Sequence, residues 1–354
     1  MKRTEYGSEY DFQANQDFIS SENTAFVKED WQLYRSGRDA MKAFARIAGR
    51  KKVLLPALCC ESMILPFELN GYKVEFYRLN EDLSCSETDV LQKLEDGCVL
   101  LYMRYFGIPA FSDAFLEGVR AMERDILIVE DRTQDIIIER RTEDFKPDAT
   151  LASLRKWAAL PDGGMLTTKL GSGAGEEDSR FARIRRNAMM KKSRYLETWE
   201  PDLKQEFLSE LNAAAQLLDE SGLPVKMGEE EEQLLRSIRF EELAKRRVDN
   251  TLLLKQLISP LAQAGKLRFV TDSPELSTLY LPIFLEDRGS VQGAMAKNDI
   301  YCPVIWPQAP GTEGVCPVAE YVIEHMLAIP CDQRYTAEDM HFIADRLTTI
   351  LTEK

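Results

Sequence analysis

The 354-residue sequence has only two histidines, His325 and His341, and no apolar run long enough to span a bilayer. Two histidines leave little material for a histidine-based metal site or a Ser-His-Asp triad. The seven cysteines are odd in number and match no zinc-binding spacing, so we expect no metal site. The chemistry of the protein must therefore depend on lysine, carboxylates or a cofactor.

The sequence also lacks a surplus of positive charge. Its net charge of −14 argues against a nucleic-acid-binding or membrane-binding surface, although a local basic pocket for an anionic small molecule remains compatible with it. The first residues lead into polar sequence rather than the apolar core of a signal peptide. We therefore expect a cytoplasmic protein.

Short apolar strands alternate with helices through the first half of the chain. Strands are predicted at residues 53–56, 73–77, 98–103, 126–131, 149–152 and 165–168. This alternation is typical of an α/β fold with a mainly parallel sheet. We expect an N-terminal arm at 1–30, a large domain at 31–235 and a smaller α+β C-terminal domain at 236–354. A long helix from residue 240 is expected to end near Ser259-Pro260.

Lys156 is the residue on which the functional interpretation depends. It follows a predicted strand and precedes Asp162-Gly163-Gly164, a flexible turn. A lysine amine is nucleophilic only when neutral, and partial burial favours the neutral form. Such an amine can form a Schiff base with a carbonyl cofactor. The alternative is an ordinary surface lysine at the start of a loop.

Asp131 lies at the carboxyl end of a predicted strand, and parallel α/β folds bind ligands at the carboxyl ends of their strands. A carboxylate there can pair with the protonated nitrogen of a pyridine ring and so let the ring accept electrons. A helix cap or a turn residue is an equally good interpretation.

Two further segments have the composition of anion sites. Ser36 and Gly37 open a predicted helix whose free N–H groups would attract an anion, although an ordinary capped helix has the same sequence. Arg334 lies in a polar turn and has the geometry to hold a carboxylate or phosphate, or else to form a structural salt bridge.

Taken in order, these segments resemble the DegT/DnrJ/EryC1/StrS family of pyridoxal-phosphate (PLP) aminotransferases, which has the fold type I architecture of aspartate aminotransferase. The resemblance runs over nearly the whole chain and rests on Ser36-Gly37-Arg38-Asp39-Ala40, residues 53–62, Phe106-Gly107-Ile108-Pro109-Ala110, residues 129–134, Lys156 with Asp162-Gly163-Gly164, and residues 327–330.

The resemblance implies a role for each matching residue. Lys156 corresponds to the catalytic Schiff-base lysine, Asp131 to the partner of the ring nitrogen, and Gln134 to the partner of the ring hydroxyl. Gly37, Arg38 and Ser153 are expected to bind the cofactor's phosphate. The family also implies a homodimer whose subunits complete each other's sites.

The chain departs from the family pattern at three places. Leu151 stands where a serine is usual, and Ser153 is three residues before the lysine instead. Cys60, or its neighbour Leu58, takes the place of the aromatic residue that stacks on the ring. Asn187, after Arg186, only loosely matches the asparagine loop that reaches the partner's site, where we expect a substrate-binding residue.

We therefore predict a PLP-dependent aminotransferase that moves an amino group from an amino acid, by the family pattern glutamate, to a keto-sugar nucleotide or another small carbonyl compound, as in sugar biosynthesis. One alternative is a PLP enzyme with another outcome, such as a dehydratase; the presence of Lys156 argues against it, because related sugar dehydratases lack the lysine. Another alternative is a non-catalytic regulator or scaffold that retains the fold.

Overall fold

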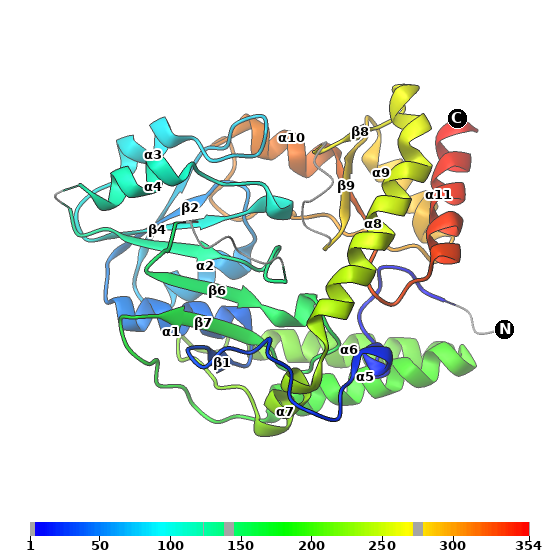
Figure 1. The fold of residues 1–354 in the computed structure, drawn as a ribbon, viewed down its shortest axis with the longest axis horizontal. Helices are drawn as coiled ribbons and strands as arrows, with labels where there is room; N and C mark the ends of the chain where they lie inside the picture. Colours follow the sequence, from blue (N-terminus) through cyan, green and yellow to red (C-terminus); the bar gives the residue numbers. More distant parts are fainter. Residues whose placement is uncertain (1–3, 123, 138–144, 272–278, 354) are drawn as a thin grey trace.

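The computed structural model describes residues 4–122, 124–137, 145–271 and 279–353, and its larger sheet has seven strands (Figure 1). The strands lie in the order β1-β7-β6-β5-β4-β2-β3, and the pairs from β6 to β3 are parallel, whereas β7 is antiparallel to both of its neighbours. Their bounds are β1 Gln32–Tyr34, β2 Lys52–Pro56, β3 Lys73–Tyr77, β4 Cys98–Met103, β5 Leu127–Asp131, β6 Ala149–Ser153 and β7 Gly164–Thr168.

Helices cover both faces of this sheet. Alternate residues of the central strands point to opposite sides: Val99 and Leu101 pack into the core with α1 and α2, whereas Leu100 packs into the core with α3 and α4. This double burial explains why the strands are apolar throughout. The helices are α1 Gly37–Ala48, α2 Glu61–Glu68, α3 Glu87–Lys93 and α4 Asp113–Arg120.

A second, three-stranded antiparallel sheet lies in the C-terminal part, in the order β10-β9-β8. The long helix α8 and the terminal helix α11 pack against each other beside it (Figure 1). The two sheets fall on opposite sides of the predicted boundary at 235/236. The remaining elements are α5 Arg180–Thr198, α6 Pro201–Leu217, α7 Glu229–Ser237, α8 Phe240–Gln263, β8 Arg268–Phe269, β9 Leu281–Phe284, α9 Arg288–Ala296, α10 Pro317–His325, β10 Met326–Ile329 and α11 Ala337–Thr352.

The predicted fold class, an α/β fold with a mainly parallel central sheet, is confirmed. The predicted end of the long helix is wrong, because α8 continues through Pro260 to Gln263. A proline removes one helical hydrogen bond. That loss is tolerated here, one turn from the end of a helix that buries Leu254, Ile258 and Leu261. Among the described residues, no helix is both long and apolar enough to cross a lipid bilayer.

The basic residues of α5 have different environments, because Arg183 and Arg194 are exposed whereas Lys192 is buried. Lys192 is 1% exposed; its Nζ donates to Ser8 Oγ at 2.8 Å and to the Glu9 carbonyl, and it lies 3.8 Å from a Glu5 carboxylate oxygen. Burial, followed by the charge of Arg334, lowers the pKa of Lys192 to about 8. This lysine therefore anchors the N-terminal arm against α5.

Candidate active site

The register of the central sheet brings three segments to one edge. Parallel pairing sets Asp131, at the end of β5, opposite Leu151 in β6, and β6 ends at Ser153. Antiparallel pairing sets Gly164 of β7 opposite both Ser153 and Tyr34 of β1. The chain turns from Tyr34 into helix α1, so the start of that helix also reaches this edge.

Two glycines allow the start of α1 and the lysine turn to meet. A Cβ on Gly164 would lie 2.0 Å from the Ser36 carbonyl oxygen, so no side chain fits there. The Gly163 N–H donates to the Arg35 carbonyl at 2.9 Å, and its own carbonyl accepts from Leu154 N at 2.9 Å. Because Leu154 begins the turn Leu154–Lys156, this pair of bonds ties the lysine to the helix start.

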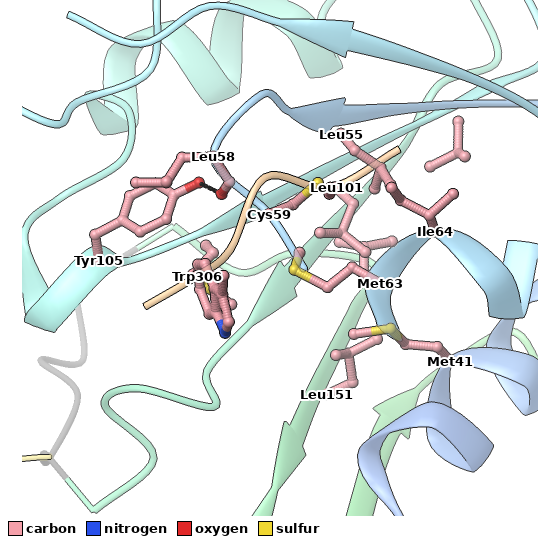
Figure 2. Close-up of a cluster of buried hydrophobic side chains, with 14 of the residues drawn as sticks. Met41, Leu55, Leu58, Cys59, Met63, Ile64, Leu101, Tyr105, Leu151 and Trp306 are labelled. Carbon is pink, nitrogen blue, oxygen red and sulfur yellow. Dashed lines mark hydrogen bonds between the residues drawn. The ribbon is translucent and has the colours of Figure 1, made fainter. Parts of the chain in front are cut away.

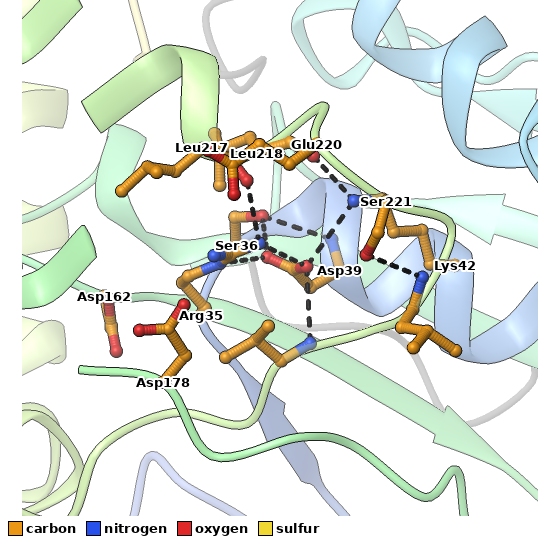
Figure 3. Close-up of polar contacts among 12 residues, drawn as sticks. Arg35, Ser36, Asp39, Lys42, Asp162, Asp178, Leu217, Leu218, Glu220 and Ser221 are labelled. Atoms are coloured by element: carbon orange, nitrogen blue, oxygen red, sulfur yellow. Dashed lines mark hydrogen bonds and ion pairs between the residues drawn. The ribbon is translucent and has the colours of Figure 1, made fainter. Parts of the chain in front are cut away.

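A buried polar cluster fixes the first turn of α1 (Figure 3). The Asp39 carboxylate accepts two hydrogen bonds from the Arg35 guanidinium, at 2.9 and 3.0 Å, and one from Ser36 Oγ at 2.6 Å. Ser36 Oγ in turn accepts from Asp39 N, which confirms Ser36 as the N-cap. Lys42, also buried, donates from Nζ to the Leu218 carbonyl at 2.6 Å. The predicted phosphate-binding turn is therefore a rigid structure.

Two adjoining cavities open at this edge of the sheet. The smaller one, of about 200 Å³, is lined by six of the predicted residues: Gly37, Arg38, Cys60, Asp131, Ser153 and Lys156. The larger one, of about 280 Å³, is lined by Lys156 together with Gln134 and Arg334. Arg155, Lys156 and Trp306 line both. The structure thus gathers residues as far apart in the sequence as Gly37 and Trp306 around one lysine amine.

Lys156 itself is exposed in the single chain, contrary to the expectation that it is partly desolvated. Its Nζ lies 5.7 Å from the centre of the Trp306 ring. The exposure has a plain cause, since the lysine forms the wall between two cavities rather than part of a packed core.

Asp131 has the opposite environment, because it is 2% exposed. Its Oδ1 accepts a hydrogen bond from Thr133 N at 2.7 Å. Burial raises the pKa of Asp131 to about 6, against the opposing effects of the Thr133 hydrogen bonds and the Lys156 charge. Because the carboxylate of Asp131 is shielded from water, a positively charged group inside the cavity would stabilise it strongly.

Gln134 and Arg334 both contact the larger cavity but are also held by other residues. Gln134 Oε1 accepts from Phe106 N at 2.7 Å, and this bond supports the left-handed φ of 51° at Phe106 in the predicted Phe-Gly turn. Arg334 forms a bidentate ion pair with Asp332, with both bonds at 2.8 Å. The salt-bridge alternative for Arg334 is therefore present, beside the cavity.

Asn187 is not brought to either cavity of this chain. It lies on α5, where its Nδ2 donates to Glu210 Oε1 at 2.7 Å. The predicted role of Asn187 concerns the site of a second subunit, so it stays a prediction.

Two residues that the sequence did not suggest belong to the site. Arg155 has no hydrogen bond or ion pair with any described residue, although its Nε is fully buried and its guanidinium lies 4.9 Å above the Phe181 ring. Burial, followed by the charge of Arg185, lowers the pKa of Arg155 to about 9. Trp306 comes from the C-terminal part. One indication for Arg155 was present in the sequence, its position next to Lys156, and there was none for Trp306.

No family model matches the sequence, and no curated protein matches it. Solved structures do match the fold. An aminotransferase of the DegT DnrJ EryC1 StrS group from Brucella abortus is 14% identical, with a TM-score of 0.58 over 91% of this chain and 86% of that one. Helicobacter pylori PseC, an aminotransferase of pseudoaminic acid biosynthesis, is 12% identical, with a TM-score of 0.62 over 99% and 100%. NtdA from Bacillus subtilis, with bound cofactor PMP, is 14% identical, with a TM-score of 0.64 over 92% and 74%.

The chain has the fold of these aminotransferases. This confirms the fold that the motif resemblance implied, fold type I with a mainly parallel sheet. Identities of 12–14% over 91–99% of this chain mean that the architecture is shared while most side chains differ.

The raised pKa of Asp131 predicts how the stability of the cofactor-free protein depends on pH. An acid whose pKa is higher when folded stabilises the folded state below its unfolded pKa, near 4, and loses that contribution as pH rises through about 6. The variant Asp131→Asn keeps the oxygen that accepts from Thr133 but cannot ionise. We expect it to match the wild type at pH 4 and to be more stable at pH 8 by up to roughly 3 kcal/mol.

Urea unfolding at the two pH values measures this difference. Other acids, including the buried Asp162, titrate equally in both proteins and cancel in the comparison. A stability difference that is the same at pH 4 and pH 8 would show that Asp131 is ionised at no unusual cost.

Proposed function

We propose that this protein is a PLP-dependent aminotransferase with Lys156 as its catalytic lysine. The observation that carries the proposal is the smaller cavity, where an amine, a buried carboxylate and the start of a helix face one space. Lys156, Asp131 and the first turn of α1 there correspond to the three groups that a pyridine aldehyde with a phosphate needs.

The phosphate end of such a cofactor fits the described residues. The first N–H groups of α1 have no helical partner, and the Ser153 hydroxyl makes no hydrogen bond with any described residue. Arg155 lines the same cavity with a guanidinium that is paired with none of the residues that the structure describes. A dianionic phosphate would satisfy the helix start, the hydroxyl and the guanidinium together. Arg38 also lines the cavity, although Asp219 holds its guanidinium at 2.6 Å.

The ring end fits as well. Asp131 would keep the ring nitrogen protonated, since an ionised carboxylate in this buried position is stabilised by a cation. Gln134 would contact the ring hydroxyl from the side of the larger cavity. When bound, PLP supplies an electron sink for charge that develops at the substrate's α-carbon. Lys156, exposed at the junction of both cavities, would carry the proton to and from that carbon.

The larger cavity would admit the substrates. It adjoins Lys156 and is lined by Arg334, which suits an acidic amino donor such as glutamate. We propose a keto-sugar nucleotide or another small carbonyl compound as acceptor, a choice in line with solved structures of this fold that are described as putative sugar aminotransferases. We also propose a homodimer, in which Asn187 contributes to the partner's site, and a cytoplasmic location. The chain would divide into an arm and two domains at residues 30/31 and 235/236.

The lysine assignment is tested by absorbance. Added PLP should give the wild type a visible band from lysine-bound cofactor, and glutamate should remove that band while 2-oxoglutarate forms. Lys156→Ala should show no such band, because the amine is missing. Lys169→Ala, at an exposed position outside both cavities, is the matched control and should retain it. A persistent band in Lys156→Ala would refute the assignment, and a band unaffected by amino acids would refute transamination.

The role of Arg155 is tested by comparing PLP with pyridoxal, which lacks the phosphate. Charged hydrogen bonds are worth roughly 1.5–3 kcal/mol, so Arg155→Met should weaken PLP binding by roughly 10- to 150-fold. Pyridoxal should bind the variant and the wild type equally. Equal losses for both ligands would place Arg155 outside the phosphate site.

A further inference from the structure

Trp306 occupies an unusual position for a residue of the C-terminal part. It is 8% exposed, lines both cavities, and lies with its ring centre 5.7 Å from the Nζ of Lys156. Of the described residues that line the smaller cavity, Trp306 alone carries an aromatic ring. Apart from Gly37 and Leu218, the other residues that line this cavity have sulfur-containing or polar side chains.

The residues between β2 and α2 include no aromatic side chain that could stack on a ligand. Cys60 is the N-cap residue of α2 and lines the smaller cavity, with its Sγ 3.2 Å from Ser62 Oγ. Leu58 and Cys59, the neighbours before it, are buried in the core cluster that Figure 2 shows. A flat heteroaromatic ligand in this cavity would therefore find a thiol where a stacking side chain is expected.

Trp306 is held close to that segment through Tyr105. The Tyr105 hydroxyl donates a hydrogen bond to the Leu58 carbonyl, and the Tyr105 ring meets the Trp306 ring edge-on at 6.2 Å (Figure 2). Both rings belong to the same buried cluster. The indole is thus fixed by packing before any ligand binds.

We propose that Trp306 provides the aromatic contact to the cofactor ring that Cys60 does not. This inference rests on the proposed function, because the ring is that of PLP. Lys156 would hold the cofactor near its Nζ, and the centre of the Trp306 indole lies 5.7 Å from that atom. A pyridinium kept protonated by Asp131 also gains from the electron-rich face of tryptophan. The cofactor would then bridge the central sheet and the C-terminal part.

The test measures dissociation constants for PLP, for pyridoxamine phosphate and for inorganic phosphate. Pyridoxamine phosphate has the same ring but no aldehyde, so its affinity reports the ring contact without a bond to Lys156. We expect Trp306→Leu to weaken both ring-containing ligands by roughly 3- to 10-fold, from the typical strength of aromatic contacts. Trp306→Phe should stay within roughly twofold of the wild type, and inorganic phosphate should bind all three proteins equally.

Trp31→Leu is the matched control, because Trp31 packs on Phe26 and lines neither cavity. If Trp306→Leu does not fold, Trp306→Met replaces it as the non-aromatic variant. Unchanged affinity of the non-aromatic variant for pyridoxamine phosphate would overturn the proposal. So would an equal loss for inorganic phosphate, which would indicate a collapsed cavity. If the wild type bound neither ring-containing ligand, the proposed function would fail first, and this inference with it.

Discussion

The site depends on the absence of a side chain at Gly164. With a Cβ only 2.0 Å from the Ser36 carbonyl oxygen, any other residue would push helix α1 away from strand β7. Gly163 then hydrogen-bonds to Arg35 on one side and to Leu154 on the other, so the start of helix α1 and the lysine turn are held as one unit. This contact, rather than any single polar residue, sets the distance between the proposed phosphate site and Lys156.

Around that contact the chain buries charge in two different ways. Asp39 is fully buried but fully partnered by Arg35 and Ser36, so it stabilises the turn that precedes α1. Asp131 is buried and Arg155 is partly buried with its Nε inaccessible, and both have less compensation; their pKa values shift toward the neutral forms, to about 6 and about 9. Groups of this second kind are costly in the empty protein and favourable once a ligand of opposite charge binds. A zwitterionic cofactor with a cationic ring and an anionic phosphate suits both.

The sequence predicted the parts of this arrangement that local patterns determine. The strands 73–77 and 98–103 were predicted with the bounds that the structure has, and Ser36 caps α1 as expected. The position of Asp131 followed from the rule that ligands bind at the ends of parallel strands, and that of Ser153 from the family resemblance. The site of Trp306 could not be predicted, because it depends on how a loop 150 residues after Lys156 packs against Tyr105. Nor did any local pattern show that Arg155 would lack a partner, since pairing is decided by distant elements such as α5.

The central claim, that Lys156 bonds covalently to a pyridine aldehyde, is tested most directly by chemical trapping. The protein would be incubated with PLP, reduced with borohydride, digested and mapped by mass spectrometry. The account predicts one dominant modified peptide, carrying the reduced cofactor on Lys156 at close to one per chain. A label spread over exposed lysines, with Lys156 modified no more than the others, would contradict it.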